Sequence, residues 1–159
     1  MSEGNNRASV CVVGLGYIGL PTAGVLAKAT GNVVGYEIDD EKRQVILGGR
    51  APFKEIGLDT ALREVLESSS LTVAETLPEA NCYIVAVPTP IDGDKNVDLA
   101  YLNSAIENVS KRLQGDELIV IESTCPPGTT QKVRSWILEA RPDPVSYTHL
   151  RAHETKATL

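Results

Sequence analysis

The sequence is short of long hydrophobic runs, aromatic residues, cysteines and histidines. No stretch of it approaches the ~20 apolar residues of a membrane-spanning helix, so we expect no membrane segment. Residues 1–7 are polar and include Glu3, a composition that does not fit a secretory signal peptide. The three cysteines, Cys11, Cys82 and Cys125, lack the spacing of metal ligands. They predict reduced thiols, a cytoplasmic protein and no metal site.

Charge and composition narrow the class further. The 159 residues include Lys+Arg 15 against Asp+Glu 21, and the net charge of -6 argues against a protein that neutralises nucleic-acid phosphates. Apolar residues make up 42% and charged residues 23%, which is ordinary for a folded protein and excludes a disordered acidic tail. The length suits one domain that buries about two-thirds of the surface of its unfolded chain.

Short apolar runs alternate with helical patterns along the chain. The runs that are rich in β-branched residues and typical of strands in a parallel sheet lie at 9–14, 33–38, 71–74, 81–87 and 118–121. Of these, 9–14, 81–87 and 118–121 are interpreted as buried strands. Helical spacing occupies 17–30, 39 or 40 to 47, 58–68, 98–113, and the segment from Thr129 or Thr130 onward. This alternation predicts an α/β fold, a doubly wound parallel sheet of the Rossmann type.

A glycine-rich turn lies between the first predicted strand and the first predicted helix. The segment Gly14-Leu15-Gly16-Tyr17-Ile18-Gly19 matches G-x-G-x-x-G in the context that a dinucleotide site requires. We expect Gly14 to allow the tight turn, Gly16 to let a pyrophosphate approach the backbone, and Gly19 to let the helix pack on the strand. The alternative is a glycine turn that serves helix packing alone.

An acidic residue follows the glycine motif at the expected distance. Glu37 closes the second predicted strand, 18 residues after Gly19, close to the ~20 expected of a carboxylate that binds an adenosine ribose. Because a carboxylate accepts both ribose hydroxyls and repels a 2′-phosphate, NAD is favoured over NADP. Lys42 and Arg43 weaken this preference, since a nearby cation could bind a phosphate. The structural alternative for Glu37 is an exposed charge at a strand end.

Two further segments carry a family resemblance. Val87-Pro88-Thr89-Pro90 ends one strand, and the segment 122–130, ESTCPPGTT, follows the next. Together with the glycine motif, and with Gly57-Leu58, they resemble the UDP-glucose/GDP-mannose dehydrogenase family of NAD-dependent nucleotide-sugar 6-dehydrogenases over residues 10–138. Segments 87–102 and 122–130 are together most similar to UDP-N-acetyl-D-mannosamine dehydrogenases, with UDP-N-acetylglucosamine and UDP-glucose 6-dehydrogenases as close alternatives.

The resemblance implies a cofactor site and one catalytic residue. The implied NAD-binding residues are Gly14, Gly16, Tyr17, Ile18, Gly19, Glu37, Lys42, Val87, Pro88, Thr89, Ser123 and Thr124. Thr124 matches the family's threonine beside the nicotinamide, which helps to order the active-site water. Without the resemblance, Thr89 and Thr124 would be interpreted as turn residues at strand ends.

The resemblance also implies the chemistry of a longer parent enzyme. That family oxidises an alcohol twice with two NAD, through a thiohemiacetal and a thioester on a cysteine, and releases a carboxylate for the synthesis of cell-surface polysaccharide. The family's cysteine lies in a later domain, and no histidine lies near Cys125 to lower its pKa, so Cys125 is rejected as the nucleophile. The chain alone is expected to bind NAD weakly without turnover. The parent is expected to form homo-oligomers through segments that this chain lacks. The alternatives are another Rossmann-fold dehydrogenase and a non-catalytic NAD-binding module.

The C-terminal segment breaks the pattern. We expect residues 1–143 to form an NAD-binding domain that is incomplete at its C-terminus, with an uncovered sheet edge and an exposed apolar helix face. Residues 144–159 have no strand or helix period and resemble the translation of a sequencing-library adapter; a genuine surface loop is the alternative. His149 and His153 both lie there, so no histidine chemistry is predicted.

Overall fold

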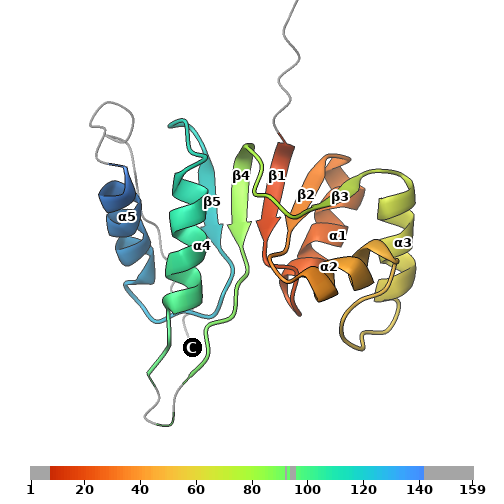
Figure 1. Ribbon diagram of the computed structural model, residues 1–159, viewed down its shortest axis with the longest axis horizontal. Helices are drawn as coiled ribbons and strands as arrows, with labels where there is room; N and C mark the ends of the chain where they lie inside the picture. Colours follow the sequence, from red (N-terminus) through yellow and green to blue (C-terminus); the bar gives the residue numbers. More distant parts are fainter. Residues whose placement is uncertain (1–7, 92, 94–95, 142–159) are drawn as a thin grey trace, which may run out of the picture.

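A parallel sheet of five strands forms the centre of the computed structural model, which describes residues 8–91, 93 and 96–141 (Figure 1). The strands are β1 (Ala8–Val13), β2 (Val33–Tyr36), β3 (Leu71–Ala74), β4 (Ala80–Val85) and β5 (Leu118–Ile121). Their order in the sheet is β3-β2-β1-β4-β5, and all neighbours run parallel. The expected boundary at residue 143 and the segment 144–159 lie outside the described residues.

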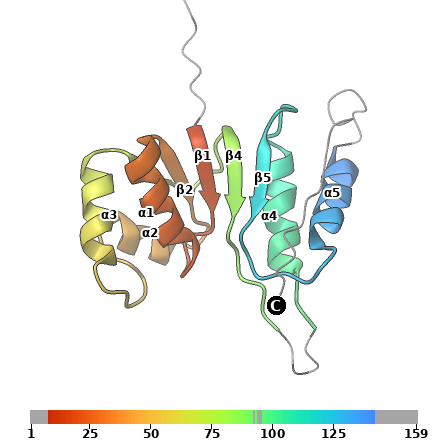
Figure 2. The ribbon, with the colours of Figure 1, turned by 180° about the vertical axis from the view of Figure 1, so that it is seen from behind.

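Helices cover both faces of the sheet, which confirms the doubly wound α/β architecture. They are α1 (Gly19–Thr30), α2 (Asp40–Leu47), α3 (Leu58–Glu67), α4 (Ala100–Ser110) and α5 (Thr129–Ala140). Figures 1 and 2 view the sheet from opposite sides, with α4 in front in the first and α1 in front in the second. No described helix is long and apolar enough to cross a membrane.

Strand β1 separates two apolar cores. Val12 packs with the buried side chains of α1, α2 and α3, whereas Cys11 and Val13 pack with those of α4 and α5. These three side chains are at most 2% exposed, as expected of a central strand in a parallel sheet. Because β1 is the middle strand of the sheet and its side chains alternate between the two cores, its carboxyl end lies at the centre of the molecule, between the two helical layers.

Strand β5 differs from the sequence prediction, which treated it as buried. It is the edge strand of the described sheet, and Leu118 and Val120 are 60% and 38% exposed. Cys82 of β4, which pairs with Leu118 in register, is half-buried. On α5, by contrast, Val133 and Ile137 are buried.

Candidate functional site

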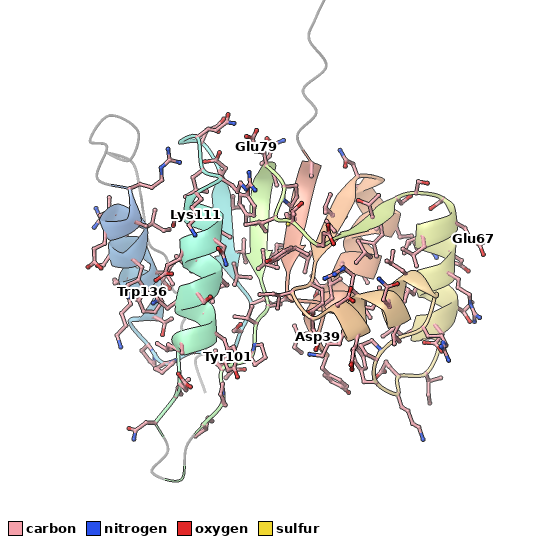
Figure 3. All side chains as sticks on the ribbon, in the orientation of Figure 1. Asp39, Glu67, Glu79, Tyr101, Lys111 and Trp136 are labelled. Atoms are coloured by element: carbon pink, nitrogen blue, oxygen red, sulfur yellow. The ribbon has the colours of Figure 1, made fainter. Side chains whose placement is uncertain are left out.

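A cleft with a volume of about 600 Å³ opens at the carboxyl edge of the sheet. It lies where β1 and β4 are neighbours and the chain continues to opposite sides, which is the position at which doubly wound sheets bind ligands. Its volume lies within the ~300–1,000 Å³ of small-molecule sites. Figure 3 shows Asp39 and Tyr101 at this edge, whereas Glu79 and Lys111 lie at the opposite one.

The three motif glycines meet different surroundings. Gly14 has φ +91°, and a Cβ there would meet the Ala86 carbonyl oxygen at 2.8 Å. A Cβ on Gly19 would lie 1.9 Å from the Gly14 carbonyl oxygen, so the start of α1 packs directly on the turn. A Cβ on Gly16 would meet nothing within 4 Å, and Gly16 lines the cleft. The turn therefore combines two tightly packed glycines with one that leaves the backbone open to the cleft.

Glu37 connects the glycine turn to the end of β2. Its side-chain oxygens accept the backbone N–H of Leu15 at 2.9 Å and that of Asp39 at 3.0 Å, and the residue is 6% exposed. The alternative of an exposed strand-end charge is therefore wrong. Glu37 still lines the cleft, and each carboxylate oxygen has a second lone pair for a ligand hydroxyl.

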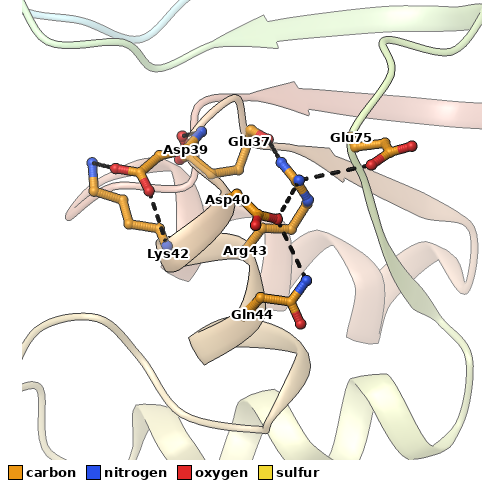
Figure 4. A network of polar contacts seen from close by, with 7 residues as sticks. All are labelled: Glu37, Asp39, Asp40, Lys42, Arg43, Gln44 and Glu75. Carbon is orange, nitrogen blue, oxygen red and sulfur yellow. Dashed lines mark hydrogen bonds and ion pairs between the residues drawn. The ribbon is translucent and has the colours of Figure 1, made fainter.

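Arg43 stabilises the same strand end from behind (Figure 4). Its guanidinium donates to the Glu37 carbonyl oxygen at 2.9 Å and to Asp40 at 2.6 Å, and it lies 3.8 Å from the Glu75 carboxylate. The side chain is 11% exposed and does not line the cleft, so Arg43 is a structural cation here. Lys42, by contrast, does line the cleft.

We expect Arg43→Met to lower the free energy of unfolding by about 1–3 kcal/mol, because it leaves a partly buried carbonyl oxygen without its charged donor. Urea denaturation measures the change. Gln44→Met, at an exposed neighbour whose amide donates to the same Asp40 at 3.4 Å, is the matched control and should stay within about 0.5 kcal/mol of the unsubstituted chain. Equal losses in both variants would contradict this account of Arg43.

The opposite wall of the cleft comes from the segments after β4 and β5, which hydroxyl groups join. Thr89 donates to the Thr124 carbonyl oxygen at 2.8 Å, and Ser123 donates to the Val87 carbonyl oxygen at 2.6 Å. Since these hydroxyl hydrogens are used within the protein, the lone pairs on the same oxygens remain as acceptors for a ligand. Val87, Pro88, Thr89, Ser123 and Thr124, which the family resemblance implies as cofactor contacts, all line the cleft.

Eleven of the twelve residues predicted to bind cofactor line this one cleft, and Gly19, which packs beneath it, is the exception.

Tyr17 is 65% exposed at the mouth of the cleft, where its ring contacts Phe53 with centroids 5.1 Å apart and its hydroxyl donates to Glu55 at 3.3 Å. The segment between α2 and α3 thereby supports the cleft without lining it.

One wall of the cleft is missing from the sequence prediction. The residues that α4 contributes are Tyr101, Ser104, Ala105 and Asn108. Their spacing of three, one and three residues places them on a single helical face. The sequence prediction covers only the apolar face of this helix. A second stripe of polar and small residues on the same helix is the sequence signal that could have identified the wall of the cleft.

The cysteines lack the features of a nucleophile. Burial raises the pKa of Cys11 to about 12, and burial also raises the pKa of the Cys125 thiol, which does not line the cleft. Among the described residues, no group of three or more histidine, cysteine and acidic side chains could hold a metal ion.

We expect iodoacetamide to label Cys125 more slowly than free glutathione near neutral pH, because less of a thiol with a raised pKa is ionised. Cys11 should stay unlabelled until the protein is unfolded. Mass spectrometry of the labelled peptides measures both rates. Labelling of Cys125 faster than glutathione would indicate an activated thiol and contradict its rejection as a nucleophile.

Comparisons with known proteins agree with this geometry. The family model for the UDP-glucose/GDP-mannose dehydrogenase family, NAD binding domain, matches residues 8–152. The chain is 46% identical over 127 residues to UDP-N-acetyl-D-mannosamine dehydrogenase of Methanococcus aeolicus, an alignment that covers 78% of this chain and 29% of that protein.

Solved structures show the same relationship. A UDP-D-ManNAc dehydrogenase from Pyrococcus horikoshii superimposes with a TM-score of 0.81 at 39% identity, covering 87% of this chain and 34% of that one. A UDP-glucose dehydrogenase from Pyrobaculum islandicum gives 0.77 at 32% identity, covering 88% and 34%. The chain spans about a third of the length of these relatives. It belongs to the UDP-glucose/GDP-mannose dehydrogenase family, and it carries that family's NAD-binding domain.

Proposed function

We propose that this chain is the NAD-binding part of an enzyme that oxidises the C6 hydroxyl of a UDP-sugar to a carboxylate with two NAD. UDP-N-acetyl-D-mannosamine is the proposed substrate, with UDP-glucose and UDP-N-acetylglucosamine as the next candidates. The choice is supported by the names of the relatives, several of which are UDP-N-acetyl-D-mannosamine dehydrogenases. The chain alone is proposed to bind NAD without turning over substrate.

The observation that carries the proposal is the open backbone at Gly16, directly before α1 and beside the carboxylate of Glu37. The pyrophosphate is proposed to bind at Gly16, in the turn before α1, with the adenosine ribose at Glu37. The nicotinamide is proposed to lie beside Thr89, Ser123 and Thr124. When bound, NAD supplies a hydride acceptor.

The residues of the far wall have distinct proposed tasks. The Thr89 and Ser123 oxygens, whose hydrogens are used within the protein, are suited to accept from the carboxamide N–H₂ of the nicotinamide. The Thr124 hydroxyl is proposed to order the water that attacks the acyl intermediate. Fixing Thr124 through its own carbonyl oxygen would hold that hydroxyl in position.

Calorimetry with NAD, followed by an NADH absorbance assay with each UDP-sugar, tests the proposal. We expect NAD binding and no NADH from this chain. The parent protein in full length should form two NADH per UDP-sugar, with the highest kcat/KM for UDP-N-acetyl-D-mannosamine. A chain that does not bind NAD would contradict the cofactor site, and a parent that binds NAD yet oxidises none of the sugars would favour the non-catalytic module.

We further propose that the protein works in the cytoplasm, that its parent is a homo-oligomer and that residues 144–159 are foreign to it. All three cysteines are unpaired, as in a reducing compartment. The proposal for residues 144–159 rests on their composition. It does not rest on the family match, which extends to residue 152. Sequencing the genomic locus across codon 143 tests it, and an unchanged reading frame through codon 159 would contradict it.

A further inference from the structure

We propose that Asp39 is a specificity-determining residue, which makes the ribose end of the cleft selective for NAD over NADP. The inference rests on the proposed function, because it takes the adenosine ribose to bind at Glu37. Asp39 follows Glu37 by two residues and lines the cleft with it. The sequence predicts the preference for NAD over NADP from Glu37 alone. In the structure, both carboxylates lie where they can contribute to that preference.

Glu37 is the less accessible of the two acids. Both of its oxygens accept backbone N–H groups, those of Leu15 and Asp39, and the residue is 6% exposed. The side chain of Asp39 is 42% exposed. Asp39 therefore presents the more accessible negative charge to a phosphate on the ribose, while Glu37 holds the turn and offers its remaining lone pairs.

Asp39 also forms an ion pair with the cation that would otherwise attract the 2′-phosphate of NADP. Lys42 is the only cation among the described residues that line the cleft. Its Nζ lies 3.6 Å from Asp39 Oδ2, and its backbone N–H donates to Asp39 Oδ1 at 3.1 Å. Arg43, the other nearby cation, is engaged with the Glu37 carbonyl oxygen, Asp40 and Glu75.

The capping position stabilises the ionised form of Asp39. Asp39 is the N-cap of α2, and the hydrogen bond from the Lys42 backbone N–H holds the pKa of its carboxyl below the usual value. Two carboxylates and one ammonium therefore line this end of the cleft, which leaves a net negative charge. A 2′-phosphate brings a charge of about −2, so it meets net repulsion, whereas the uncharged ribose hydroxyls of NAD do not.

The test compares dissociation constants for NAD and NADP by calorimetry in the unsubstituted chain and in Asp39→Asn. Asparagine caps a helix about as well as aspartate, so α2 is preserved while the charge is lost and Lys42 is released. We expect NADP binding to tighten about tenfold, the effect of one charge in a partly solvated site, with NAD changing less than about threefold. An unchanged ratio of the two constants would overturn the inference.

Two companion variants identify the cause. Asp40→Asn makes the same charge change one residue later, at a side chain that is 71% exposed and outside the cleft, and should leave the NADP to NAD ratio unchanged. Asp39→Asn/Lys42→Gln should lose the gain in NADP binding. An equal shift in Asp40→Asn, or a gain that survives in the double variant, would overturn the inference. An unsubstituted chain that binds no NAD would contradict the proposed function instead.

Discussion

Gly19→Ala is expected to lower the free energy of unfolding by more than about 3 kcal/mol. The new Cβ would lie 1.9 Å from the Gly14 carbonyl oxygen and 3.0 Å from its carbonyl carbon. Both atoms belong to the backbone of the turn, so no side chain can rotate away, and α1 must move off β1. Losses of this size arise when a substitution overpacks a site that cannot relax.

Urea denaturation of Gly19→Ala against Gly24→Ala measures this effect. Gly24 also lies in α1, but a Cβ there would meet nothing within 4 Å. Since alanine is favoured over glycine inside a helix, Gly24→Ala should be as stable as the unsubstituted chain or more so, by up to about 1 kcal/mol. A Gly19→Ala chain as stable as Gly24→Ala would show that the contact of α1 with the glycine turn is not required.

Gly16→Ala is expected to weaken NAD binding strongly without unfolding the chain. A Cβ at this position meets no protein atom within 4 Å, so the fold should retain its stability to within about 1 kcal/mol. Gly16 lines the cleft where the pyrophosphate is proposed to approach the backbone. A methyl group there would hold the phosphate oxygens away from the N–H groups of the turn, and we expect affinity for NAD to fall at least about thirtyfold, equivalent to roughly 2 kcal/mol.

Thermal unfolding with and without NAD reports both properties at once. A ligand that binds the folded chain raises its stability in proportion to RT ln(1 + [L]/Kd), so the unsubstituted chain and Gly24→Ala should be stabilised by NAD. Without NAD, Gly16→Ala should unfold at nearly the same temperature as the unsubstituted chain, and at the same NAD concentration it should be stabilised much less. A full response in Gly16→Ala would place the pyrophosphate elsewhere in the cleft.

Much of the candidate site could be predicted from the sequence because its signals are local. A G-x-G-x-x-G turn between a strand and a helix has one main structural use, and an acid at the end of the next strand follows from the same unit. The strands are confirmed within a few residues at every position, and Leu71–Ala74 and Leu118–Ile121 match the prediction at both ends. Local spacing determines these features, since each depends on residues close together in the chain.

The roles of single side chains at the site were less predictable. Glu37 was assigned to the ribose, but its hydrogen bond to the Leu15 backbone joins residues 22 positions apart, which no local pattern encodes. The same holds for Thr89 and Thr124, which are joined across 35 positions. Such contacts exist only once the ends of neighbouring strands are brought to one edge of the sheet.

The sequence by itself determined the class of fold, the glycine turn and the acid that follows it, because hydrophobic period and turn chemistry are properties of short segments. The tertiary structure decided which strand became the edge, so Leu118 and Val120 are exposed although their run is as apolar as that of a central strand. It also decided that α4 lines the cleft. These outcomes depend on strand order and on which helices pack beside the sheet edge, and both form only when distant segments come together.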